Sequence, residues 1–228
     1  MIYIVGHRGA AGVRPENTIE GFNYAIDLGV DYVECDIHLT SDNQLIVMHD
    51  LAVDRTTDGS GKIADLSFET IRSLDAGSGQ QVPTLEEVLR TTRGKVHLLC
   101  ELKGEGTEMA AIEAVCAHQM EQEVTFTSFH VERIQKVKRT DANLRIGAVF
   151  ANPSEDDIKF AKDIGAGGIG TQFRNICFRI IEQAHKVELD IRAWNPDTLD
   201  DQLAMIGLGV DGVSTNRPDV LMEHIKKG

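Results

Sequence analysis

The sequence has few cysteines, and they form no pattern. Four occur in 228 residues, at Cys35, Cys100, Cys116 and Cys177, and none belongs to a Cys-x-x-Cys pair. Four cysteines at these spacings do not make a disulfide framework. The chain is therefore not a small disulfide-stabilised scaffold, and we predict free, buried thiols.

The sequence also lacks long hydrophobic runs and an excess of basic residues. No apolar run approaches 18 residues, and the apolar segment 2–5 is too short for a signal peptide, so we expect a cytoplasmic protein without stable membrane association. Acidic residues outnumber basic ones by 36 to 23, which gives a formal charge of −13. This charge argues against nucleic acid as a partner. An anionic substrate would need local positive charge or a metal ion.

The fold class follows from an alternation of strand and helix patterns. The chain is long enough for one α/β domain, residues 1–228, and 42% of its residues are hydrophobic. Eight strand and helix units at this length predict an α/β fold of the (β/α)8 TIM barrel type. A doubly wound open sheet is the alternative, but no Gly-x-Gly-x-x-Gly opens a helix. The eight strands are predicted around residues 2–5, 33–37, 96–102, 124–126, 144–150, 168–171, 189–194 and 210–214.

Polar residues and glycines mark where helices begin and where the repeat is interrupted. Capping residues and apolar stripes predict helices that begin near Asn17, Thr84, Ser128, Ser154, Phe178, Thr198 and Pro218. Residues 51–82 lose clean periodicity and are rich in Gly, Asp, Ser and Thr. We interpret this segment as a small insertion after the second strand, a lid above the site.

The segment 31–50 is the most informative part of the chain. Glu34 and Asp36 alternate with apolar residues, so they share one face of a strand. A turn at 41–44 and a short return strand would bring His49 back beside them. Two carboxylates on one face repel each other unless a cation is bound or their pKa values rise. We therefore predict a metal site here.

The barrel prediction brings distant residues to one place, because the active site of this fold lies at the carboxyl ends of the strands. Three carboxylates there suit a hard divalent cation, Mg2+, Ca2+ or Mn2+, better than zinc. Cys35 and Cys100 face the other way and are discounted as ligands. The polar and aromatic residues predicted at these strand ends are His7, Arg8, Glu34, Asp36, His49, Glu101, Lys103 and Trp194.

This set of side chains fits phosphodiester cleavage. Arg8 and Lys103 supply fixed positive charge for a phosphate, and two histidines can divide proton transfer. Trp194 is either core filling or a platform for the substrate. Two other functions were weighed: a non-catalytic phosphate-binding protein, which would not need the histidines, and a barrel lyase that uses Lys103 as a Schiff-base amine. Glu101 should keep Lys103 protonated and unreactive in the second.

Several motifs together resemble the glycerophosphodiester phosphodiesterase family. The resemblance runs from residue 2 to about 220, and it implies a (β/α)8 barrel with a small insertion at 51–82. The motifs, in chain order, are His7-Arg8-Gly9, Pro15-Glu16-Asn17-Thr18, Glu34-x-Asp36, His49-Asp50, Arg55-Thr56-Thr57-x-Gly59-x-Gly61, Pro83-Thr84-Leu85-x-Glu87, Glu101-x-Lys103, Trp194 and Thr215-Asn216-Arg217-Pro218.

The resemblance implies roles for the residues that match these motifs. Glu34, Asp36 and Glu101 would ligate one divalent cation, Mg2+, Ca2+ or Mn2+. His7 and His49 would be the general acid and base. Arg8 and Lys103 would contact the phosphate, with Trp194 as a further substrate contact. The implied reaction, in glycerol and lipid metabolism, is hydrolysis of a small glycerophosphodiester to sn-glycerol 3-phosphate and an alcohol. A phosphodiesterase for lysophospholipids ranks second, because 51–82 shows no apolar patch. Homo-oligomerisation is left open.

Overall fold

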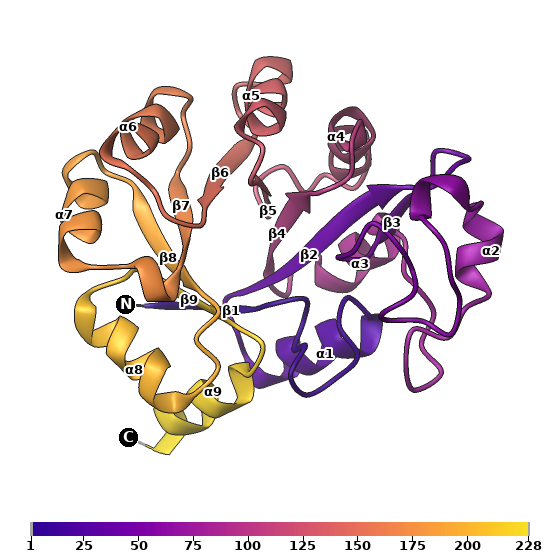
Figure 1. Ribbon diagram of the computed structural model, residues 1–228, viewed down its shortest axis with the longest axis horizontal. Coiled ribbons are helices and arrows are strands. Elements are labelled where there is room, and N and C mark those ends of the chain that lie inside the picture. Colours follow the sequence, from indigo (N-terminus) through magenta and orange to yellow (C-terminus); the bar gives the residue numbers. More distant parts are fainter. Residues whose placement is uncertain (1, 228) are drawn as a thin grey trace.

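The computed structural model describes residues 2–227, and its centre is a closed barrel of eight parallel strands (Figure 1). Hydrogen bonds join neighbouring strands in the order β1-β9-β8-β7-β6-β5-β4-β2, and pairing of β1 with β2 closes the ring. The predicted (β/α)8 fold is confirmed. The barrel strands are β1 (Tyr3–Gly6), β2 (Tyr32–Leu39), β4 (His97–Leu102), β5 (Val124–Ser128), β6 (Arg145–Phe150), β7 (Gly168–Gln172), β8 (Asp190–Trp194) and β9 (Gly212–Thr215).

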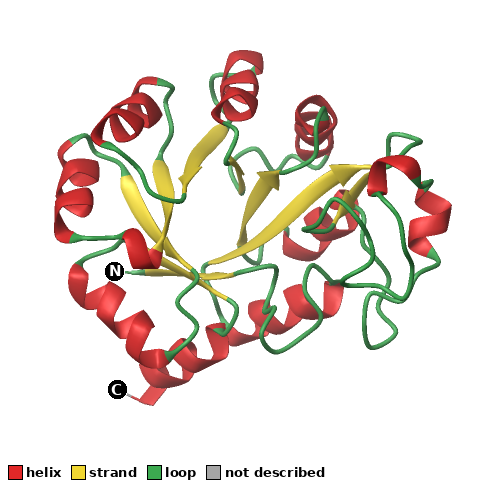
Figure 2. Ribbon diagram, viewed as in Figure 1, coloured by secondary structure: helices red, strands yellow, loops and turns green. Residues whose placement is uncertain are grey.

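Helices lie around the outside of the barrel (Figure 2). Apolar side chains on the outer faces of the strands pack against them in one continuous core. None of the helices in residues 2–227 is long and apolar enough to cross a membrane. The helices that follow the strands are α1 (Ile19–Leu28), α3 (Leu85–Thr92), α4 (Thr107–Ala117), α5 (Val131–Thr140), α6 (Glu155–Asp163), α7 (Phe178–Lys186), α8 (Leu199–Leu208) and α9 (Pro218–Lys227).

Capping chemistry placed most of these helix starts correctly. Thr84 and Ser154 each form a reciprocal capping box, and Thr198 caps α8 as predicted. Two predictions were wrong by one or two residues. Thr18, not Asn17, caps α1, because its hydroxyl accepts the Gly21 N–H at 3.1 Å. His130, not Ser128, precedes α5.

Ser128 and Asn17 have other partners. The Ser128 hydroxyl donates to the Leu102 carbonyl, which joins β5 to β4. Asn17 is buried and bonded to the neighbouring strand β2, as described below. The prediction of buried thiols held for Cys35 and Cys100 and was wrong for Cys116 and Cys177, which are exposed on or beside helices.

The segment between β2 and α3 lies beside the barrel (Figure 1). Strand β3 (Leu45–Val47) pairs antiparallel with the end of β2, which is the predicted reversal. Residues 51–82 contain a short 3-10 helix (Ile63–Asp65) and α2 (Phe68–Arg72). With two residues that precede the segment, they form a small apolar cluster separate from the main core: Ile46, Met48, Val53, Ile63, Ile71, Ala76 and Val82.

Candidate active site

A pocket of about 100 Å³ lies at the carboxyl ends of the barrel strands. It exists because every second residue of a strand faces the barrel interior, so that residues at the ends of different strands converge. All eight residues predicted from the sequence line this pocket, with five others: Phe129, Val149, Arg192, Asn195 and Ser214.

Three buried or half-buried carboxylates form the floor of the pocket. Glu34, Asp36 and Glu101 each place one oxygen within 4.8 Å of the others. Burial and the negative charge of Asp36 raise the pKa values of Glu34 and Glu101. Burial also opposes ionisation of Asp36, but the charges of Lys103 and Arg8 outweigh it and lower its pKa.

The carboxylate cluster fits a divalent cation. Glu34 Oε1 is buried and has no hydrogen-bond partner, although buried carboxylate oxygens are normally paired. A hard cation takes several oxygen ligands of this kind. The described residues could therefore hold a metal ion at Glu34, Asp36 and Glu101, and the free oxygen of Glu34 is the observation that favours it.

Two cations flank the carboxylates. Arg8 Nε lies 3.4 Å from Asp36, and the backbone N–H of Arg8 donates to Glu34 at 2.9 Å. Lys103 Nζ lies 3.0 Å from Glu101 and 3.4 Å from Asp36. Each cation has further N–H groups that could bind a phosphate.

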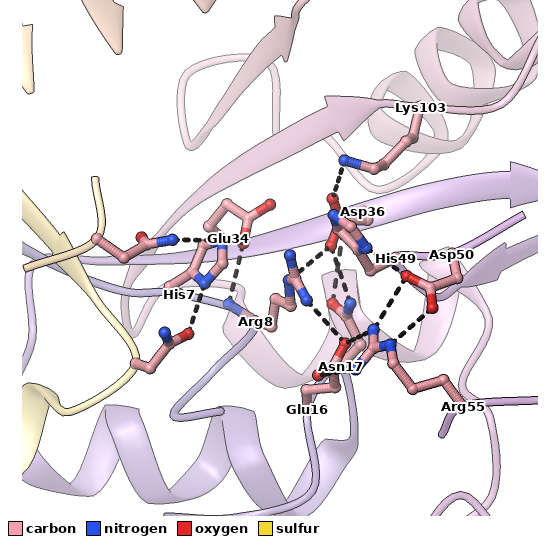
Figure 3. A network of polar contacts seen from close by, with 12 residues as sticks. His7, Arg8, Glu16, Asn17, Glu34, Asp36, His49, Asp50, Arg55 and Lys103 are labelled. Carbon is pink, nitrogen blue, oxygen red and sulfur yellow. Dashed lines mark hydrogen bonds and ion pairs between the residues drawn. The ribbon is translucent and has the colours of Figure 1, made fainter. Parts of the chain in front are cut away.

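The backbone of Arg8 is held in a conformation that L-residues seldom adopt. Its φ is 50°, and Asn17 has a φ of 56°. The Asn17 N–H donates to the Arg8 carbonyl at 3.0 Å, and the Asn17 amide donates to Asp36 at 3.0 Å (Figure 3). Asn17 thus fixes both the loop that carries His7 and Arg8 and one carboxylate of the cluster.

Hydrogen bonds define the tautomer of His7. The amide nitrogen of Asn216 donates to Asp197 at 2.8 Å, so the Asn216 oxygen is free to accept from His7 Nδ1, at 2.7 Å. The proton of a neutral His7 therefore lies on Nδ1, and Nε2 faces the pocket, 3.8 Å from Glu34. Burial and the charge of Arg8 lower the pKa of His7 to about 4. The ring is neutral at pH 7.

His49 has a different environment. Its Nδ1 lies 2.6 Å from Asp50, which Arg55 contacts at 2.6 and 3.0 Å. Arg55 also donates two hydrogen bonds of 2.8 Å to Glu16, which in turn accepts from Arg8 (Figure 3). Burial outweighs the effects of Asp36 and Asp50, which act to raise the pKa of His49, so that its pKa is lowered. Asp50 thus favours the protonated form of His49.

Aromatic side chains form one wall of the pocket. The rings of Trp194 and Phe129 meet edge to face with centroids 5.7 Å apart, and Lys103 Nζ lies 5.8 Å from the Phe129 ring. Phe129 is 43% exposed. Trp194 lines the pocket, and its contact with substrate stays a prediction.

Several residues that orient the site's side chains were not predicted from the sequence. Asp197 and Asn216 orient His7, while Glu16, Asp50 and Arg55 connect His49 to Arg8. All except Asp197 lie within the motifs quoted above, so their positions carried a signal. Some of their partners did not, because the contacts of Asn216 with His7 and of Arg55 with Glu16 join segments far apart in the chain.

Comparison with known proteins agrees with this geometry. Residues 7–220 match the model of the glycerophosphoryl diester phosphodiesterase family, and the chain belongs to that family. The glycerophosphodiester phosphodiesterase of Caldanaerobacter subterraneus subsp. tengcongensis is 33% identical over 238 residues, covering 99% of this chain and 98% of that relative. The glycerophosphodiester phosphodiesterase of Bacillus subtilis is 30% identical and covers 100% of this chain and 87% of its own.

Solved structures share the fold. The glycerophosphodiester phosphodiesterase of Agrobacterium tumefaciens superposes with a TM-score of 0.85 at 28% identity, over 97% of this chain and 100% of that one. A phosphodiesterase of Oleispira antarctica, solved with the product sn-glycerol 3-phosphate, gives a TM-score of 0.90 at 23% identity, over 98% and 96%. Family membership confirms the enzyme class predicted from the sequence.

Proposed function

We propose that the protein hydrolyses small glycerophosphodiesters to sn-glycerol 3-phosphate and an alcohol. The observation that carries this proposal is the joint presence, in one pocket, of three clustered carboxylates, two cations and two imidazoles held in different protonation environments. The named activity of the relatives above and the product bound to the Oleispira antarctica structure support the choice of substrate.

One divalent cation, Mg2+, Ca2+ or Mn2+, would be held by Glu34, Asp36 and Glu101. When bound, it would polarise a phosphoryl oxygen and stabilise the negative charge that develops during displacement. Arg8 and Lys103 would bind the remaining phosphate oxygens, because their free N–H groups face the same pocket.

The two histidines would act in different steps. His7 Nε2 carries no proton at pH 7, so His7 is the base that takes a proton from the attacking water molecule. His49, whose Nδ1 is held by Asp50, presents Nε2 and is the acid that gives a proton to the leaving oxygen. Environments that push the pKa values of two titratable groups apart divide an acid from a base in this way.

A substrate series tests this proposal. Glycerophosphocholine, glycerophosphoethanolamine and lysophosphatidylcholine would be supplied separately to the protein with Mg2+, and release of glycerol 3-phosphate or choline would be measured. We expect glycerol 3-phosphate from the first two substrates. Turnover of lysophosphatidylcholine alone would replace the proposal by the lysophospholipid reaction. Binding of glycerol phosphate without turnover of any substrate would favour the non-catalytic binding protein.

A further inference from the structure

The barrel interior below the catalytic pocket is not filled by side chains. In most barrels of this type, bulky residues from alternate strands fill the interior in layers. Here four interior positions on β6, β7 and β9 are glycines: Gly147, Gly168, Gly170 and Gly212. Gly147, Gly168 and Gly170 line a cavity of about 270 Å³ at the amino-terminal ends of the strands, which we call the amino-terminal cavity, whereas the Tyr3 ring occupies the space beside Gly212.

Arg192 lies between this cavity and the catalytic pocket, and it lines both. On β8 it pairs in register with Gly170 and Gly212, two residues before Trp194. A methyl group at Gly170 would lie 2.9 Å from Nη2 of Arg192, so the guanidinium occupies the space that this glycine leaves. The missing side chain at Gly170 thus makes room for the arginine, and the amino-terminal cavity lies beside it.

Among the described residues, the guanidinium of Arg192 is not paired directly with a carboxylate, although its charge acts to lower the pKa of Glu101. Arg192 is only 9% exposed, and its buried Nε makes no hydrogen bond. Within residues 2–227, no hydrogen bond or ion pair of Arg192 is found. A buried guanidinium without a partner costs free energy, and in most proteins such a charge is paired. An anion in the cavity would supply the missing partner.

The other polar groups of the cavity also suit an anion. Lys138 and Arg145 lie along it, and each uses one N–H on a backbone carbonyl, which leaves the others free. Asp190 is the one acid in the lining, so three cations oppose one carboxylate in a chain of net charge −13. Burial raises the pKa of Tyr3, whose hydroxyl therefore remains a hydrogen-bond donor.

We propose that the amino-terminal cavity is a second binding site, for a small phosphate or phosphate monoester held by Arg192. The volume equals that of roughly nine water molecules, which admits a phosphate with a few carbon atoms and excludes a lipid. A guanidinium pairs with phosphate through two parallel N–H groups, which an ammonium group cannot do. The site goes beyond the proposed reaction, because it shares none of the carboxylates or histidines.

Isothermal titration calorimetry tests this site with inorganic phosphate and, separately, with sn-glycerol 3-phosphate, on the protein with Mg2+. Arg192→Gln removes the charge. Gly147→Val fills the cavity and keeps the charge, since a Cβ at Gly147 meets its nearest atom at 3.4 Å. Lys103→Met weakens binding at the catalytic pocket only. Arg90→Gln, on an exposed ion pair of α3, is the matched control for loss of an arginine.

We expect two binding events in the wild type. Gly147→Val should weaken one of them at least about tenfold and leave the event that Lys103→Met weakens. Arg192→Gln should weaken the same event at least about tenfold, as expected when a hydrogen bond to a charged group is lost, and it should also affect the other event, because Arg192 lines both pockets. Arg90→Gln should bind as the wild type. The ligand that binds more tightly in this event shows whether the site is one for free phosphate or one for a phosphate monoester.

The proposal is wrong if a single binding event is found and Lys103→Met removes it, or if Gly147→Val and Arg192→Gln both bind as the wild type. Thermal unfolding shows whether each variant is folded. Gly147→Val decides the question alone if Arg192→Gln does not fold. Neither result depends on turnover, so failure of this site and failure of the proposed reaction are distinguishable.

Discussion

Replacement of Asp50 by asparagine should weaken catalysis without unfolding the protein. Asp50 accepts a hydrogen bond of 2.6 Å from His49 Nδ1, and its charge stabilises the protonated ring. A hydrogen bond to a charged group contributes roughly 1.5–3 kcal/mol, so kcat should fall about tenfold to hundredfold. Because Asp50 and His49 are 31% and 29% exposed, we expect the lower end of this range.

The pH dependence identifies the cause of that loss. Asp50 acts to raise the pKa of His49, so Asp50→Asn should lower it. If His49 is the acid, activity that needs its proton should then decline at a lower pH than in the wild type. Steady-state rates between pH 5 and 9 with glycerophosphocholine measure this shift.

A matched substitution in the same segment controls for the loss of charge. Asp54 also precedes the glycine-rich loop and accepts the Gly61 N–H, but it lies outside the catalytic pocket. Asp54→Asn should retain kcat and the pH profile. If Asp50→Asn keeps kcat within about twofold of the wild type and the profile does not move, the assignment of Asp50 as the residue that positions His49 is refuted.

Three further variants test the site and the fold. Asp197→Asn should disturb the Asn216 amide that orients His7 and reduce kcat about tenfold with little change in KM, and an unchanged kcat would contradict the assigned tautomer. Although burial opposes ionisation of Glu87, hydrogen bonds from Arg72 and Thr84 lower its pKa, so that its folded pKa lies below the unfolded value. Glu87→Gln should therefore reduce the free energy of unfolding by about 1 kcal/mol at pH 7 and by progressively less as the pH falls below 4.5. Urea titrations at several pH values measure this difference. Leu98→Ala should reduce the free energy of unfolding by about 2–5 kcal/mol, because Leu98 is fully buried on β4, and a loss under 1 kcal/mol would show that the core relaxes around the cavity.

The sequence predicted those parts of the fold that depend on local period and strand order. Alternation in 33–37 identified the strand that carries Glu34 and Asp36, and the rule that strand ends converge brought His7, Glu101 and Trp194 to the same pocket. These inferences needed no knowledge of which strands are neighbours, because all eight close one ring.

Contacts between distant segments could not be predicted in the same way. Asparagine is a common helix-capping residue, but the backbone of Asn17 has a positive φ and its side chain bonds to Asp36. The next residue, Thr18, caps the helix. The pairing of Arg55 with Glu16 joins residues 39 positions apart. No prediction followed from the glycines inside strands, although in the barrel Gly170 leaves room for Arg192 beside the amino-terminal cavity.

The most direct test of the central claim is release of sn-glycerol 3-phosphate from glycerophosphocholine by the wild type, His7→Gln and His49→Gln. Each protein would be assayed after EDTA treatment and after Mg2+, Ca2+ or Mn2+ is added back singly. We expect metal-restored release by the wild type and its loss in both folded variants. Release that survives EDTA, or persists in either histidine variant, would contradict this expectation.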